Sequence, residues 1–304
     1  YADRCMFCTD DKHPSDLLEK GHIDYIIKKA ISMGADPILA IKVASTNAAR
    51  YFRLNNRGAI ALGYLADFVI IDSFEEFTVE QVYKKGKLMY SGGKLKDFRA
   101  PTVDEFLTER AHSTFKVDRL KPEAFKIDRP RGVLGMVPGE LMTTDEGYAT
   151  GVDIDKDILK IAVVERHNYT GHIGIGYIKG YGLRRGAVAT SISHDSHNII
   201  VVGTNDEDMA AAVNHIAENG GGITVFDGGK CIGDVKLGIA GLMSDAPLID
   251  VNRNLEDAKA RAFELGVSKL IDPFMTLSFM SLPVIPKLRL TTRGVFDVES
   301  QSYV

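Results

Sequence analysis

The sequence lacks an apolar run long enough to cross a bilayer. About 20 consecutive apolar residues are needed to span the hydrocarbon core, and polar or charged residues interrupt every apolar stretch before that length. The first residues also lack the basic segment followed by an apolar segment that is typical of a secretory leader. The sequence therefore predicts neither a membrane span nor secretion.

Cysteine is scarce, and basic residues do not outnumber acidic ones. An odd count of three cysteines in 304 residues does not indicate a disulfide framework, so we expect a reducing, cytoplasmic compartment. The formal net charge is −4, whereas nucleic-acid binding requires a concentrated basic surface. We therefore expect no nucleic-acid partner, and a small molecule is the more natural ligand.

The overall composition is that of a globular protein. Apolar residues make up 45% of the chain, and its length predicts one large domain or two smaller ones. The chain begins at Tyr1 without an initiator methionine, and an apolar segment, Cys5–Cys8, follows at once. Such a beginning is typical of the middle of a fold. It predicts that an N-terminal part of the same polypeptide is a partner of this chain.

The first half of the chain is expected to contain helices and then strands. The opening apolar segment predicts a short buried strand that ends at the polar cluster 9–14. Apolar residues at helical spacing predict one helix from Ile23 to about Gly34, and Asp36-Pro37 predicts the start of a second that runs to about Arg50. Glycines and apolar runs predict a β-rich segment over 57–93.

The second half predicts a mixed α/β domain. A charged stretch with three prolines, 95–131, places a domain boundary near residue 125. Thr204 and Glu207 form a capping-box pattern that predicts a helix ending at the glycines 220–222, and 255–265 predicts another helix. Apolar runs predict strands at 158–164, 187–192, 199–202 and 223–226.

The polar cluster 9–14 contains the first candidate site residues. A carboxylate at the C-terminal end of a barrel strand can bind a metal and accept a proton from water, and Asp10 is the candidate for that role. Beside it, Asp11 and His13 either hydrogen-bond to this group, contact a substrate or are solvated turn residues. The alternative for the whole cluster is a turn with a helix cap.

A second candidate group is the loop that contains His194 and His197. Two histidines that flank Asp195 and Ser196 at the end of a predicted strand either contact a metal or substrate or belong to a solvated loop. The pair Cys5-x-x-Cys8 has the spacing of a zinc or redox site. Residues three apart in a strand point to opposite faces, however, so we expect these cysteines to be small core residues.

A composite motif follows the polar cluster. Asn47-x-Ala49-Arg50 is followed by Gly58-x-Ile60-x-x-Gly63-x-x-Ala66-Asp67. With the preceding Asp10, this order resembles the end of an amidohydrolase-superfamily protein: a last barrel strand, barrel helices and a glycine-rich turn into a β-sandwich. An appended domain is similar to that of the adenine deaminase branch of the superfamily, and the resemblance covers essentially the whole chain. The segments most similar to that branch are 7–14, 19–23, 171–174, 193–198 and 241–245.

The resemblance implies an α/β fold in three parts. Residues 1–53 would be the C-terminal end of a TIM-like amidohydrolase barrel, 54–125 a β-sandwich portion with a linker, and 126–304 an appended mixed α/β domain. The implied reaction of the intact enzyme is the hydrolytic deamination of adenine to hypoxanthine and ammonia in purine salvage, and a homo-oligomer is expected.

The resemblance also implies roles for the candidate residues. Asp10 would ligate a divalent metal and act as general base, in a binuclear manganese, iron or zinc site. The remaining ligands, a His-x-His pair with further Glu and His residues, would lie before residue 1, so we expect the isolated chain to be inactive. The loop with His194 and His197 would contribute to the purine pocket.

Three alternatives differ in their sequence requirements. A zinc deaminase of the cytidine-deaminase type needs His-x-Glu followed by Pro-Cys-x-x-Cys, and neither motif is present. Another amidohydrolase that acts on a cyclic amide would share Asp10 and the glycine-rich turn but not the appended domain. A non-catalytic fragment that only binds a partner is the third alternative.

Overall fold

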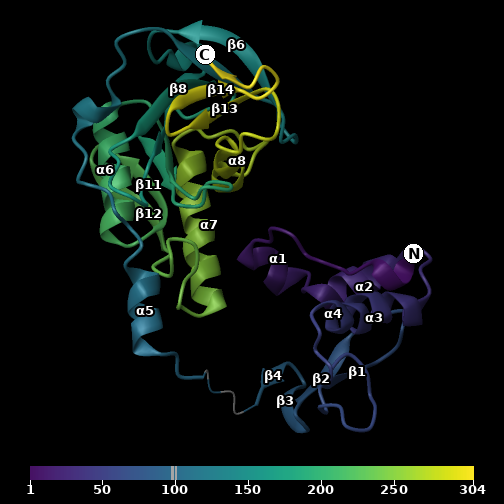
Figure 1. Cartoon of the computed structure of the whole chain (residues 1–304). Coiled ribbons are helices and arrows are strands. Elements are labelled where there is room, and N and C mark those ends of the chain that lie inside the picture. The colour runs from purple at the N-terminus through teal and green to yellow at the C-terminus, as the bar shows by residue number, and fades with distance from the viewer. Residues whose placement is uncertain (97–98, 100) are drawn as a thin grey trace. The chain divides into compact units, whose positions relative to one another are not determined.

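The computed structural model describes residues 1–96, 99 and 101–304 and is shown in Figure 1. The chain divides into two compact units, Tyr1–Thr102 and Val103–Val304. The predicted boundaries at residues 53 and 125 stay predictions. Helices and strands occur in both units, which confirms a mixed α/β fold. No helix in the described part of the chain is long and apolar enough to cross a membrane.

The N-terminal unit begins with helices. The second predicted helix starts as expected, because the Asp36 side chain accepts a hydrogen bond from the Leu39 backbone N–H at 2.8 Å and Pro37 occupies the first helical position. It is split in two at Ser45. Within residues 1–96 the helical elements are η1 (Ala2–Arg4), α1 (Pro14–Glu19), α2 (Ile23–Ser32), α3 (Pro37–Ala44) and α4 (Thr46–Tyr51).

A small antiparallel sheet completes this unit and confirms the predicted β-rich segment. Its strand order follows the sequence: β1 (Phe68–Ile71), β2 (Val79–Lys84), β3 (Lys87–Ser91) and β4 (Lys94–Leu95). The buried apolar cluster of the unit consists of Ile27, Ala40 and Phe77, with partly buried neighbours from α2, α3 and β1. This core is small for a unit of this length.

The prediction that the opening segment forms a strand is wrong. No strand forms over residues 5–9, and Cys5 and Cys8 are exposed rather than part of a core. The physical reason lies in Asn47 of α4, whose side-chain amide donates hydrogen bonds to the carbonyls of Ala2 and Cys5 at 2.8 and 2.9 Å. A side chain therefore binds backbone carbonyls that a neighbouring strand would otherwise bind.

The C-terminal unit is built on an eight-stranded sheet within residues 131–236, all of which the structure describes. Its order is β12-β11-β9-β10-β7-β8-β5-β6, and the β5–β8 pair is parallel while the other neighbours are antiparallel. The strands are β5 (Arg131–Met136), β6 (Thr143–Ala149), β7 (Ile158–Val164), β8 (Ile173–Lys179), β9 (Ala187–Thr190), β10 (Ile199–Gly203), β11 (Gly222–Asp227) and β12 (Lys230–Lys236).

Helices and a second sheet cover this large sheet. The elements before and between its strands are α5 (Glu105–His112), η2 (Pro122–Phe125), η3 (Ile154–Lys156) and α6 (Asp206–Glu218). Those after it are α7 (Leu248–Glu264), α8 (Pro273–Phe279), β13 (Leu288–Thr291), β14 (Gly294–Asp297) and β15 (Ser302–Tyr303). Helix α6 begins one residue later than the capping-box pattern predicts, because Asn205 is the N-cap and accepts from the Asp208 N–H at 2.8 Å.

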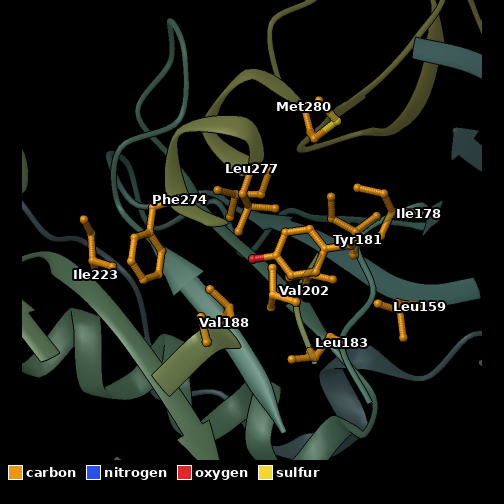
Figure 2. Packing of buried hydrophobic residues seen from close by; sticks show 14 of the residues in the cluster. Leu159, Ile178, Tyr181, Leu183, Val188, Val202, Ile223, Phe274, Leu277 and Met280 are labelled. Atoms are coloured by element: carbon orange, nitrogen blue, oxygen red, sulfur yellow. The ribbon is translucent and has the colours of Figure 1, made fainter. Parts of the chain in front are cut away.

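Alternate residues of the central strands enter two different cores. On β7, Ile161 and Val163 pack with α7, α8 and the sheet β13–β15, whereas Ala162 and Val164 pack with α6 and the segment around Phe125. Figure 2 shows part of the first core, where Tyr181 lies among aliphatic side chains. Its hydroxyl donates to the Pro273 carbonyl at 2.9 Å, which satisfies a fully buried polar group.

The burial of both faces of the central strands leads to a prediction about the stability of β10. Replacing Ile200, which is fully buried in the first core, by Ala should lower the free energy of unfolding by about 2–5 kcal/mol because a cavity remains. Leu270→Ala is the control, since Leu270 is 74% exposed, and its effect should stay within about 0.5 kcal/mol. Urea unfolding of the chain followed by circular dichroism measures both. Equal losses would contradict the assignment of β10 to the core.

Candidate functional site

Asp10 lies in the irregular segment between η1 and α1. Its backbone has a φ of 55°, in the left-handed region that Asp tolerates better than most residues. The side chain is exposed, and its Oδ1 accepts a hydrogen bond from the Asp11 backbone N–H at 2.9 Å. This bond orients the carboxylate while its other oxygen makes no hydrogen bond within the described residues.

The two other candidates of the cluster occupy the same loop. Asp11 is exposed, and His13 is partly buried at the N-cap of α1, directly before Pro14. The His13 side chain makes no capping hydrogen bond to that helix. The structure thus places all three predicted residues on one short segment, on which Asp10 and Asp11 are exposed and His13 is half-buried.

The N-terminal unit also contains an apolar cavity of about 580 Å³. Its walls come from α2, α3, β1 and β2, and include Ile27, Phe68 and Phe77. None of the three candidates of the polar cluster lines it. The carboxylate of Asp67 at its edge is already bound by Arg57, by Lys84 and by the Lys85 N–H. The cavity therefore has the character of a packing surface rather than that of a polar ligand site.

The second candidate loop, 191–198, connects β9 to β10 in the C-terminal unit. The ring of His194 stacks on Phe279 of α8, with centroids 4.6 Å apart and planes 14° apart. The His194 and His197 rings lie 5.5 Å apart, and Nδ1 of His194 lies 3.6 Å from the Asp195 carboxylate. The structure therefore brings the two predicted histidines together. Their roles stay predictions.

A buried arginine, Arg166, hydrogen-bonds to the backbone of this loop. Arg166 is almost completely buried, and its Nε donates to the His197 carbonyl at 2.5 Å while its other guanidinium nitrogens contact Ala240 and Thr114. Its guanidinium lies 4.2 Å from the ring centroid of Phe115. Burial lowers the pKa of Arg166 to about 10, so the group stays charged near neutral pH.

Sequence reasoning missed Arg166 and the other supports of the loop. His167 Nε2 lies 2.8 Å from the Ser196 carbonyl, and the Ser281 hydroxyl donates to the His194 carbonyl at 3.0 Å. These partners come from positions far apart in the chain. Arg166 follows a strand end, where most arginines are solvated, so no local pattern in one sequence could identify it as buried.

The electrostatics of the loop favour a neutral His197. Burial, followed by the nearby His194 and Arg166, lowers the pKa of His197 below the ordinary histidine value of 6.5. Its Nδ1 accepts a hydrogen bond from the Ser193 N–H at 3.3 Å, which places the proton of the neutral ring on Nε2. The residue can therefore present an N–H donor to a ligand at neutral pH.

Comparison with known proteins gives two family matches in this chain. The family described as the adenine deaminase C-terminal domain matches residues 139–302, and the amidohydrolase family matches residues 2–89. The loop with His194 and His197 lies in the first match and Asp10 in the second. Together the two matches extend over most of the chain.

Several curated proteins are similar over the whole chain. Adenine deaminase 2 of Carboxydothermus hydrogenoformans is 44% identical over 314 residues, which cover 100% of this chain and 54% of the relative. The adenine deaminases of Nitratidesulfovibrio vulgaris strain DP4 and Bacillus licheniformis are 44% and 41% identical, and the alignments cover 99% of this chain and 54% and 53% of those proteins. The chain spans about half the length of the curated relatives it matches.

The lowered pKa of His197 predicts a pH dependence of stability. The unfolded chain takes up a proton near pH 6.5, whereas the folded state resists protonation. The contribution of His197 is therefore complete above pH 6.5 and is lost as the pH falls towards the folded pKa. Unfolding by urea between pH 7.5 and 5 should show this loss of unfolding free energy. In His197→Asn the loss should be smaller, because no histidine titrates at this position. Asn is chosen because it tolerates the left-handed backbone there.

The control for this measurement is His172→Asn, which changes an exposed histidine. It should leave the pH dependence of the unfolding free energy as in the unchanged chain. A His197→Asn variant whose pH dependence matches that of the control would contradict the buried, neutral state of His197.

Proposed function

Since the chain belongs to the adenine deaminase C-terminal domain family, we propose that the intact protein to which it contributes hydrolyses adenine to hypoxanthine and ammonia. The observation that carries the proposal is the occurrence of the amidohydrolase match and the adenine deaminase match, in this order, on one chain. The reaction consumes one water for each adenine, and the amino group at C6 leaves as ammonia.

The proposal includes a divalent metal. Amidohydrolases generally use such metals, and we propose a binuclear manganese, iron or zinc site with Asp10 as one ligand. The exposed Asp10 carboxylate suits this role because one of its oxygens is oriented by the Asp11 N–H and the other is not bound by a described residue. A metal lowers the pKa of bound water to about 7.

The chain itself would supply proton transfer and contacts to the substrate. Asp10 accepts the proton of the attacking water and passes it to the departing amine. Asp11 and His13 lie beside it and would hydrogen-bond to the site or to the purine. Nε2–H of His197 suits an acceptor nitrogen of a purine ring, and His194 would complete that contact.

The wider architecture forms part of the same proposal. Residues 1–53 would close a TIM-like barrel, 54–125 would belong to a β-sandwich, and 126–304 would form the appended domain. The apolar cavity bounded by α2, α3, β1 and β2 supports this arrangement, because its walls need an apolar partner. That partner would be the N-terminal part of the same polypeptide, in a cytoplasmic homo-oligomer.

Two other functions make different predictions. Another amidohydrolase would hydrolyse a cyclic amide and leave adenine unchanged. A non-catalytic fragment would bind a partner without turnover. Measurements with the intact protein separate the three cases: ammonia release from adenine and adenosine, and ring opening of a cyclic amide followed by chromatography. Turnover of adenosine without turnover of adenine would overturn the proposal.

The proposed base makes a mutational prediction for the intact protein. Asp10→Asn keeps the shape of the side chain but removes the proton acceptor, so kcat for adenine should fall by about 10²–10⁴-fold, with circular dichroism unchanged. Asp11→Asn is the matched control on the neighbouring exposed carboxylate and should retain more activity. Near-normal turnover by Asp10→Asn would show that Asp10 is only a turn residue.

The isolated chain of residues 1–304 should show no adenine turnover. Among the residues the structure describes, Asp10 belongs to no group of three or more His, Cys, Asp or Glu side chains close enough to hold one ion. A single carboxylate does not fix the geometry of a catalytic metal. The assay adds manganese, iron(II) or zinc to purified chain, with mass spectrometry to exclude a co-purified fragment. Turnover by the pure chain would refute the assigned ligand set.

A further inference from the structure

Three side chains of metal-ligating types lie close together at the β12 edge of the large sheet. His215 lies on α6, and Cys231 and Asp234 lie on β12. A ring nitrogen, the sulfur and a carboxylate oxygen of these residues all lie within 4.8 Å of one another, which is the only such group in the part of the chain that the structure describes. The proposed deamination uses none of these residues.

A β-bulge places Cys231 and Asp234 on the same face of the sheet. Residues three apart in a regular strand point to opposite faces. The register between β11 and β12 shifts here, so that Phe226 pairs with Cys231 and Thr224 pairs with Asp234. Because Thr224 and Phe226 are two apart, their partners share a face. The extra residue in β12 thus brings the side chains of Cys231 and Asp234 to the same face.

Helix α6 supplies the third ligand to this face. The ring of His215 packs against Phe226, with centroids 5.5 Å apart at 65°. Its Nε2 lies 3.2 Å from a carboxylate oxygen of Asp234 and 3.8 Å from the sulfur of Cys231. With usual bond lengths, a tetrahedral zinc ion separates a nitrogen and an oxygen ligand by about 3.4 Å and a nitrogen and a sulfur ligand by about 3.6 Å. Both measured distances are therefore close to those that one ion requires.

The surroundings also suit a cation. The Nε2 atom of His215 lies 2.9 Å from the amide nitrogen of Asn219 and also lies near Asp234 and Cys231, although a single ring nitrogen can serve only one of them as donor or acceptor. The Thr224 hydroxyl lies 3.4 Å from the sulfur. Within the described residues no lysine or arginine forms an ion pair with Asp234, so its charge is available to a metal.

We propose that His215, Cys231 and Asp234 bind one zinc-class divalent ion, with water in the fourth position. A thiolate with an imidazole selects a borderline-soft metal over magnesium or calcium. Thiolate and carboxylate together neutralise the two charges of the ion. The ion links α6 to the edge strand β12 and is independent of the metal proposed beside Asp10.

Cobalt(II) gives a direct test, because a cobalt–thiolate bond has a charge-transfer absorption in the near ultraviolet. Reduced, metal-free chain should bind one equivalent of cobalt with this band, and zinc should displace it. Cys231→Ser should abolish the band, and His215→Gln and Asp234→Asn should weaken cobalt binding. Zinc should raise the melting temperature of the unchanged chain but not that of Cys231→Ser, because a ligand that binds only the folded state stabilises it.

The exposed thiols of Cys5 and Cys8 provide the control. A chain with Cys5→Ser and Cys8→Ser should keep the band and the zinc-dependent rise in melting temperature. A band that persists in Cys231→Ser, or that disappears in the double variant, would place the ion at the N-terminal thiols and overturn the proposal. Failure of the unchanged chain to bind cobalt or zinc at micromolar concentrations would also overturn it. Circular dichroism establishes that each variant is folded.

Discussion

The C-terminal unit depends on the burial of its central strands from both sides. Every residue of β9 and β10 is buried, and β7 and β11 are buried over most of their length. Strands of this kind gain stability from each face, at about 25 cal/mol per Å² of apolar surface removed from water. Neither face is sufficient alone, because each side chain of a strand contributes to only one of the two cores. Helix α6 on one side and α7 with α8 on the other are therefore required together.

This constraint explains where polar chemistry can occur in the unit. The central strands carry few polar side chains, whereas the loops at strand ends and the edge strand β12 carry more. The loop 191–198 begins and ends on fully buried strands, and Arg166 anchors its backbone through the His197 carbonyl. At the edge, β12 departs from regular pairing, and its bulge turns Cys231 towards α6. In both places a rigid core fixes the backbone from which functional side chains project.

The sequence predicted the elements whose pattern is local and strong. The apolar runs of β7, β9, β10 and β11 and the helix α6 lie close to their predicted positions, because a buried strand or an amphipathic helix is recorded in consecutive residues. The opening segment was predicted wrongly since strand formation depends on a partner, and Asn47 binds its carbonyls instead. The pairing of His194 with His197 was predictable from their loop. Arg166 and the grouping of His215 with Cys231 depend on residues distant in sequence and on a bulge, which no periodicity reveals.

The two units differ in how completely they bury their apolar residues. The C-terminal unit has two extensive cores, whereas the N-terminal unit has three buried apolar residues in its cluster and leaves Ile60 and Leu62 almost fully exposed. Large apolar side chains that remain exposed favour association with further apolar surface. In the proposed enzyme, the polypeptide that covers these side chains would also supply the remaining metal ligands. Burial of this surface and assembly of the site around Asp10 would then be a single event, so that the carboxylate becomes catalytic only when its unit is stably folded.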